Sequence, residues 1–135
     1  MEISGLAKLV IYLFGIYNLI LGLIAVVFPS LGAAFYSVNT ITNEWIALSR
    51  WTGALAIAIA YGAFTVVKTK DGRIINIIII SAIASLVASI LNIIKGNAAW
   101  ANVIVDLTAQ IAVLLALVFA GRKDEITPTM KKLSH

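Results

Sequence analysis

The sequence predicts an all-α membrane protein: four transmembrane helices in an up-and-down bundle, with a short interfacial element between the first two. Hydrophobic residues make up 61% of the chain and charged residues 12%, and the mean hydropathy is +1.04. Soluble domains carry about 25% charged residues, so this composition indicates a surface that faces lipid. With 135 residues, the chain has the length of one domain.

Four apolar runs predict the helices, at about residues 6–28, 44–67, 74–94 and 98–120. Each approaches or exceeds the roughly 20 residues that cross a bilayer. Breaks separate them at Pro29, at Asp71-Gly72 and at Lys95-Gly96. We therefore expect a single transmembrane domain over residues 1–121, followed by a charged cytoplasmic tail over 122–135. The first run is longer than a signal-peptide core, which predicts an uncleaved span, with a cleaved signal as the alternative.

Small residues recur at helical spacing on three of these helices and predict close helix contacts. The groups are Gly15, Asn18 and Gly22; Ser49, Gly53, Ala56 and Ala60; and Ser81, Ser85, Ala88 and Asn92. The connection over residues 30–43 keeps several apolar side chains. It predicts a short interfacial helix over about Leu31–Ser37, or alternatively a lid over the mouth of the bundle.

Positive charges predict the topology. With a cytoplasmic N-terminus, eight of the ten Lys and Arg residues lie inside, and only Arg50 and Lys95 lie near the outside. Lys and Arg concentrate in cytoplasmic loops, so both termini are expected in the cytoplasm of a cell membrane. The cytoplasmic group is Lys8, Lys68, Lys70, Arg73, Arg122, Lys123, Lys131 and Lys132.

The last apolar run carries the main polar site. Asn102, Asp106 and Gln110 fall within an arc of roughly 100° on a helix. A carboxylate near the bilayer centre costs about 3 kcal/mol, so it needs a partner or a wet cavity. Arg50 is expected at a depth from which it can reach Asp106 as an ion pair, and Asn92 lies in the same half of the membrane. The opposite face is expected to contact lipid: Val103, Leu107, Ile111, Leu114 and Val118.

Two interpretations of this intramembrane site (Arg50, Asn92, Asn102, Asp106 and Gln110) stay open. The residues could line a cavity for a small polar ligand or a lipid headgroup, or they could form a mutually satisfied network that fixes helix register. Both predict a non-catalytic protein, either an accessory subunit of a membrane complex or a bundle that binds a small ligand or lipid. The alternative is a small carrier in which Asp106, with Arg50, couples transport to a proton or a substrate.

Several classes of chemistry lack the side chains they need. The chain has no cysteine, and His135 is its one histidine, which leaves no thiolate or paired imidazole for haem, zinc or iron–sulfur clusters. Hydrolysis would need an activated nucleophile or paired carboxylates, and we expect neither. No cofactor or metal is expected. The expected partners are membrane lipids, other membrane subunits or a second copy, and not nucleic acid.

The order of these features resembles a group of small prokaryotic four-helix membrane proteins with a DoxX-like layout. The resemblance rests on Leu21-Gly22-Leu23 leading to Pro29, on Glu44 with Arg50 and Gly53, and on the positive turn that ends at Arg73. The chain departs from DoxX in its first helix, which has no early arginine. The resemblance implies a four-helix fold and no settled activity.

Overall fold

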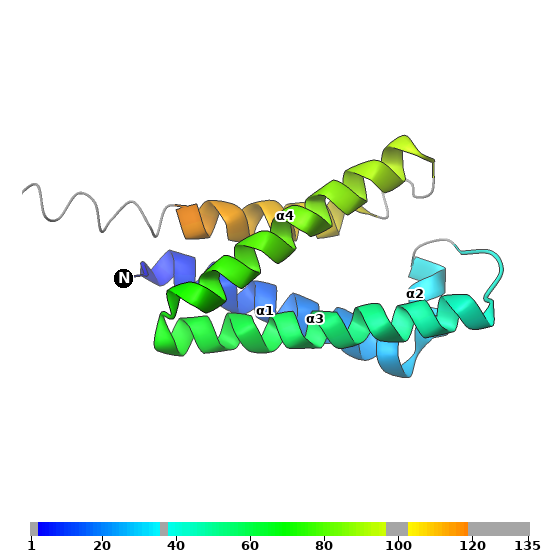
Figure 1. Ribbon diagram of the computed structural model, residues 1–135, viewed down its shortest axis with the longest axis horizontal. Helices are drawn as coiled ribbons and strands as arrows, with labels where there is room; N and C mark the ends of the chain where they lie inside the picture. The colour runs from blue at the N-terminus through cyan, green and yellow to red at the C-terminus, as the bar shows by residue number, and fades with distance from the viewer. Residues whose placement is uncertain (1–2, 36–37, 97–102, 119–135) are drawn as a thin grey trace, which may run out of the picture.

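The computed structural model describes residues 3–35, 38–96 and 103–118, and the secondary-structure elements among them are all helices. They are α1 (Gly5–Val27), α2 (Pro29–Phe35), α3 (Asn43–Thr69), α4 (Gly72–Ile94) and a last helix, Val103–Val118 (Figure 1). The four longer helices alternate in direction along the long axis (Figure 1). The prediction of an all-helical fold is confirmed. By length and composition, α1, α3 and α4 could each cross a membrane.

Polar side chains cap the starts of the three long helices. The Ser4 hydroxyl accepts a hydrogen bond from the Ala7 backbone N–H at 3.2 Å, and Thr42 does the same for Trp45 at 3.2 Å. The Asp71 carboxylate accepts from the Arg73 N–H at 2.8 Å. Lys70 adopts the left-handed conformation, with φ of 55°, which ends α3 and lets α4 begin two residues later.

α1 and α3 pack most closely, through glycines. A Cβ built on Gly22 would lie 2.7 Å from the carbonyl oxygen of Gly53, and a Cβ on Gly53 would lie 2.7 Å from that of Gly22. Ser49 adds a polar link, since its hydroxyl donates to the Ala25 carbonyl at 3.1 Å. The small-residue faces predicted on these two helices are therefore confirmed as the α1–α3 contact.

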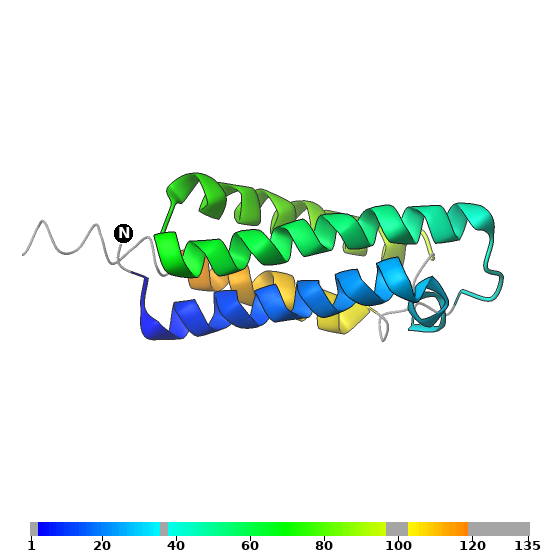
Figure 2. The same cartoon turned by 90° about the horizontal axis from the view of Figure 1, so that it is seen from below.

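The bundle is closed at one end by an apolar core. The core combines the residues leading into α1 and its first half, the end of α3, the start of α4 and the last helix: Ile3, Ala7, Ile11, Phe14, Ala63, Val66, Ile75, Ile78, Ala82, Val113 and Leu117. α4 lies beside α3 near their short connection and separates from it toward Ile94, so the helices splay apart at the α2 end (Figure 1). The view from below shows α1 and α3 running side by side along the bundle (Figure 2).

Two predicted helix faces are wrong. On α4, Ala82 and Ser89 are buried, one residue beyond the predicted Ser81 and Ala88. On the last helix, Val103 and Leu107 are buried, although they were expected to contact lipid. Leu114 is half-buried, whereas Ile111 and Val118 are exposed, as a lipid-facing side chain must be. Core and lipid demand equally apolar side chains, so hydropathy alone does not distinguish the two sides.

The connection after α1 contains the short helix α2, close to where an interfacial helix or lid was expected; residues 36 and 37 of that prediction lie outside the described residues. The indole N–H of Trp45 on α3 donates to the Pro29 carbonyl at 3.4 Å and so links α3 to the start of α2.

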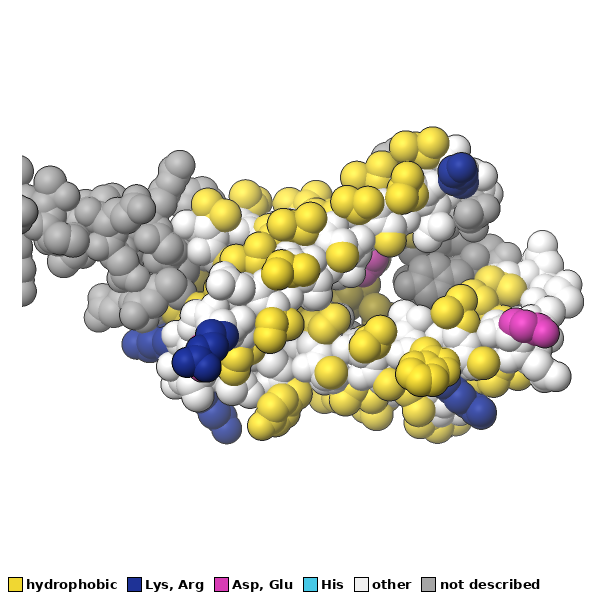
Figure 3. Space-filling view, viewed as in Figure 1, with side chains coloured by type: hydrophobic (Ala, Val, Ile, Leu, Met, Phe, Trp, Pro, Cys, Tyr) yellow, Lys and Arg dark blue, Asp and Glu magenta, His cyan; other side chains and the backbone are white. Residues whose placement is uncertain are grey.

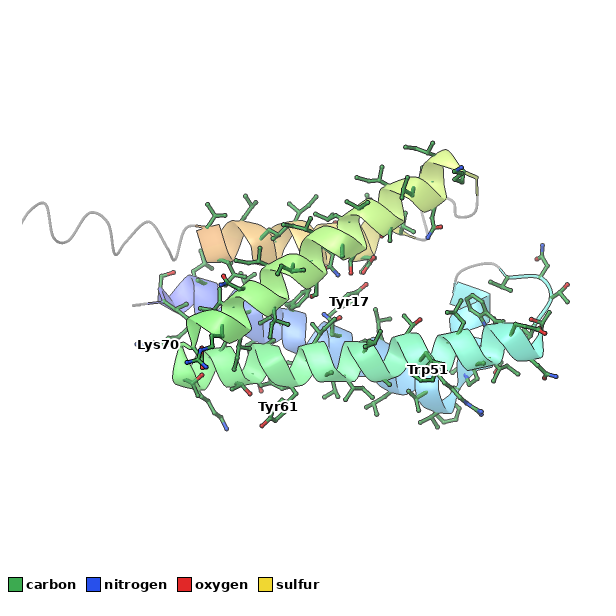
Figure 4. All side chains as sticks on the ribbon, in the orientation of Figure 1. Tyr17, Trp51, Tyr61 and Lys70 are labelled. Carbon is green, nitrogen blue, oxygen red and sulfur yellow. The ribbon has the colours of Figure 1, made fainter. Side chains whose placement is uncertain are left out.

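The outer surface is apolar. Large side chains that include Trp51, Tyr61 and Leu6 are more than 70% exposed, and Trp51 and Tyr61 point away from the bundle (Figure 4). Hydrophobic side chains also cover much of the face shown in Figure 3. Such a surface is stable next to lipid chains and would be unfavourable in water.

Candidate functional site

The carboxylate of Asp106 is the centre of the polar site, and donors from three helices converge on it. The Tyr17 hydroxyl of α1 donates to Oδ1 at 3.2 Å, and the Ser89 hydroxyl of α4 donates to Oδ2 at 2.9 Å. Within the last helix, Gln110 Nε2 donates to Oδ1 at 3.4 Å. Figure 4 shows Tyr17 directed into the space between the helices. The half-buried carboxylate is thus held by neutral donors.

Local helix geometry explains why these residues meet. Gln110 follows Asp106 by four residues, which places the two side chains one turn apart on the same side of the helix. Ser89 follows the buried Ala82 by seven residues and therefore shares the inner face of α4. Tyr17 follows the buried Phe14 by three residues, so its side chain lies near the inner face of α1. The neighbouring Asn18 is also buried, and its amide donates to the Phe14 carbonyl at 2.9 Å.

Gln110 has an unmet hydrogen-bonding capacity. Its side chain is 4% exposed, and its Oε1 has no hydrogen-bond partner among the residues that the structure describes. The negative carboxylate fixes the amide orientation, because Nε2 can donate to Asp106 whereas Oε1 would be repelled. A buried polar oxygen without a donor costs about 1–3 kcal/mol. The site therefore holds an acceptor that would gain from a donor brought by another molecule.

Asp106 and Gln110 line a cavity of about 650 Å³ where α4 diverges from α3. The polar wall also includes Asn18, Ser49 and Ser85, and Trp45 contributes an indole. Leu31 and Gly32 of α2 border the same space. Acidic surface is visible within the hollow between α3 and α4 in Figure 3. The rest of the wall is apolar.

A second, shallower groove of about 430 Å³ lies between α1 and the last helix. Its walls are mostly apolar, and Tyr17 borders it. Because the Tyr17 hydroxyl also donates to Asp106, this side chain connects the outer groove with the polar site.

The predicted ion pair between Arg50 and Asp106 is wrong. Arg50 is exposed on α3, and none of the contacts of Asp106 with described residues is an ion pair. At about 100° per residue, Arg50 points roughly 100° away from Ser49 and 60° from Gly53, which face α1. The buried side of α3 is closed by glycines against α1 and leaves no room for a guanidinium.

The other predicted site residues divide between the cavity and the surface. Gln110 is buried and in contact with Asp106, as expected of a shared face. Asn92 is exposed near the end of α4, where that helix has moved away from α3. Asn102 lies outside the described residues. The structure thus brings together two of the five predicted residues.

Sequence reasoning missed Tyr17 and Ser89 as partners of Asp106. One signal was present for Tyr17, because a phenol in the middle of an apolar helix needs a hydrogen-bond partner when it turns inward. Ser89 offered none, since serines are common in helix contacts within membranes. Among the described residues, no group of three His, Cys, Asp or Glu side chains could hold a metal ion.

Comparison with known proteins adds no relative: no protein-family model, curated protein or solved structure matches this chain.

Proposed function

We propose that this chain is a non-catalytic integral membrane protein whose four longer helices span a cell membrane and enclose a binding cavity for a small ligand. The observation that carries the proposal is the pairing of Asp106 with Gln110 at the wall of the 650 Å³ cavity. The carboxylate there is held by neutral donors, and the neighbouring amide oxygen has no partner in the described part of the chain.

These features favour a ligand site over a purely structural network. A structural network would be expected to satisfy its buried polar atoms, because unsatisfied ones reduce stability. Here Gln110 Oε1 has no donor among the described residues, and the Gln110 side chain borders the open cavity. The volume lies within the range of about 300–1,000 Å³ typical of small-ligand pockets. The cavity is also why we prefer a ligand-binding bundle to an accessory subunit.

The charge distribution supports an orientation with both termini in the cytoplasm. The α3–α4 connection, with Lys68, Lys70 and Arg73, then lies inside, and the splayed end near α2 faces outward. In this arrangement α2 forms one rim of the cavity, and a ligand enters from the outer side of the membrane.

A small carrier is the second candidate, and the Asp106–Gln110 contact favours it. The amide can donate Nε2–H to an ionised carboxylate or, after rotation, accept from a protonated one. Such a pair could exchange a proton for a substrate. In sealed liposomes, a carrier would give a proton flux that requires both substrate and Asp106, whereas a binding protein would give none.

Cysteine labelling tests the cavity directly, because the chain has no native cysteine. Ser85 lines the cavity, while Ser81, one turn earlier, does not line it and donates instead to the Ile78 carbonyl. We expect a water-soluble methanethiosulfonate reagent to modify a Ser85→Cys variant in membranes at least tenfold faster than a Ser81→Cys variant. Equal rates, or no reaction at position 85, would contradict a solvent-accessible cavity.

A further inference from the structure

We infer that the cavity takes a primary ammonium group attached to an apolar tail. The inference rests on the proposed binding function and names the chemical class of its ligand. It follows from three properties of the cavity: the charge of Asp106, the unpartnered oxygen of Gln110, and the apolar character of the remaining wall.

The first property requires a positive charge. Asp106 accepts hydrogen bonds from neutral groups, and no Lys or Arg side chain in the described part of the chain lines the cavity. A carboxylate in a low-dielectric site is stabilised strongly by a nearby cation. An anionic ligand would instead be repelled by Asp106.

The second property requires N–H donors on that cation. Gln110 Oε1 is buried and lacks a donor within residues 3–35, 38–96 and 103–118, and it belongs to the side chain that already contacts Asp106. A primary ammonium has three N–H groups, which can reach the carboxylate and the amide oxygen together after a small rotation of the Gln110 amide. A quaternary ammonium brings the charge but no donor and would leave Oε1 unsatisfied.

The third property requires a tail. Apolar side chains from α1, α2 and α3 form most of the wall: Leu21, Ile24, Leu31, Leu48, Leu55 and Ile59. Hydrated inorganic cations gain nothing from such surfaces, whereas an alkyl chain does. Trp45 adds an aromatic face to the same cavity, which also suits an organic cation.

Binding of decylamine provides the test. The protein, carrying Trp51→Phe and Trp100→Phe so that Trp45 is its one tryptophan, is placed in phosphatidylcholine nanodiscs and titrated while Trp45 fluorescence is recorded. We expect saturable binding of decylamine. Decyltrimethylammonium, which has the charge without N–H groups, should bind at least tenfold more weakly, and so should neutral N-decylacetamide.

Variants locate the binding. Asp106→Asn should weaken decylamine binding at least tenfold, and Ser85→Phe, which fills the cavity, should abolish it. Thr108→Val serves as the matched control, because Thr108 is exposed on the last helix and does not line this cavity; it should bind as the parent does. The comparison of ligands on the parent protein decides the inference even if Asp106→Asn fails to fold.

The ammonium could come from a free amphipathic amine or from a phosphatidylethanolamine headgroup. Nanodiscs containing phosphatidylethanolamine distinguish them, because a headgroup in the cavity would compete with decylamine and raise its apparent Kd. Either source supports the inferred chemistry.

The remaining outcomes separate the inference from the proposed function. If decanoate or N-decylacetamide binds as well as decylamine and Ser85→Phe blocks it, the cavity binds ligands but the ammonium class is wrong. If no probe gives a saturable response, both the ligand class and the binding function are overturned.

Discussion

Gly22 of α1 and Gly53 of α3 meet backbone to backbone, because a Cβ on either would lie 2.7 Å from the other's carbonyl oxygen. Backbone atoms cannot rotate away as a side chain can. We therefore expect Gly53→Ala to lower the free energy of unfolding by about 1–3 kcal/mol, the usual cost of overpacking. Reversible unfolding in mixed micelles would measure it.

Gly62→Ala on the same helix is the matched control. A Cβ there would lie 3.5 Å from Ile74 Cγ2, an ordinary contact. Alanine also favours a helix over glycine by up to about 1 kcal/mol. Gly62→Ala should leave stability unchanged or raise it, and an equal loss at both positions would contradict the close α1–α3 contact.

Asp106→Asn should not destabilise the ligand-free protein. The carboxylate has neutral donors as partners, and the substitution removes a charge from an apolar setting while Asn keeps an oxygen that can accept from Tyr17 or Ser89. The free energy of unfolding should stay within about 1 kcal/mol or rise. A loss of about 3 kcal/mol or more would contradict a carboxylate that is held by neutral donors, because a loss of that size is typical of breaking a buried ion pair.

Gln110→Met should weaken the binding of decylamine without lowering the free energy of unfolding substantially. Methionine has a similar length and removes both the buried oxygen, which lacks a donor among the described residues, and the 3.4 Å hydrogen bond from Nε2 to Asp106. Because these two effects oppose each other, the free energy of unfolding of the ligand-free protein should stay within about 1 kcal/mol of the parent. Binding of decylamine should fall at least tenfold, because one acceptor is lost. A thermal-unfolding series with and without the amine would show both effects, and unchanged binding would show that Oε1 plays no part.

Single cysteines can test the orientation in the membrane. Asn39 and Thr69 are exposed at opposite ends of the bundle, at the α2 end and the α3–α4 connection respectively. In intact cells, a membrane-impermeant maleimide should label Asn39→Cys. Thr69→Cys should react only after the cells are permeabilised. The reverse pattern would place the termini and the cavity mouth on the opposite sides.

The helices and the α1–α3 contact were predictable because their signals are local. Apolar runs of sufficient length define the spans, and glycines at helical spacing, such as Gly15 and Gly22, have few roles in an apolar helix other than close packing. The short helix α2 was likewise suggested by apolar residues within a polar connection.

The partners of Asp106 were not predictable in the same way. The expected depths of Arg50 and Asp106 differed by no more than an arginine side chain can bridge, but depth says nothing about the direction in which a side chain points around the helix axis. In the structure, the uncharged hydroxyl groups of Tyr17 and Ser89 donate hydrogen bonds to the Asp106 carboxylate. A search of the sequence for opposite charges overlooks such donors. The predictions of the buried faces of α4 and the last helix were wrong for a related reason, since contact with lipid and burial in the protein core both favour apolar side chains.

The one-ended packing of α4 has a mechanical consequence. Its first half is buried in the apolar core through Ile75, Ile78 and Ala82. Its second half reaches the site through Ser85, which lines the cavity, and Ser89, which donates to Asp106. A helix of 23 residues is about 34 Å long, so a rotation of about 5° at the Lys70–Asp71 connection moves its far end by about 3 Å. Such a rotation would leave the glycine contact between α1 and α3 in place, and it would lengthen the hydrogen bond from Ser89 to Asp106. If the helices span a membrane as proposed, a bilayer that is thinner or thicker than the splayed helices would act on the far end of α4, and we expect the volume of the cavity to change with bilayer thickness.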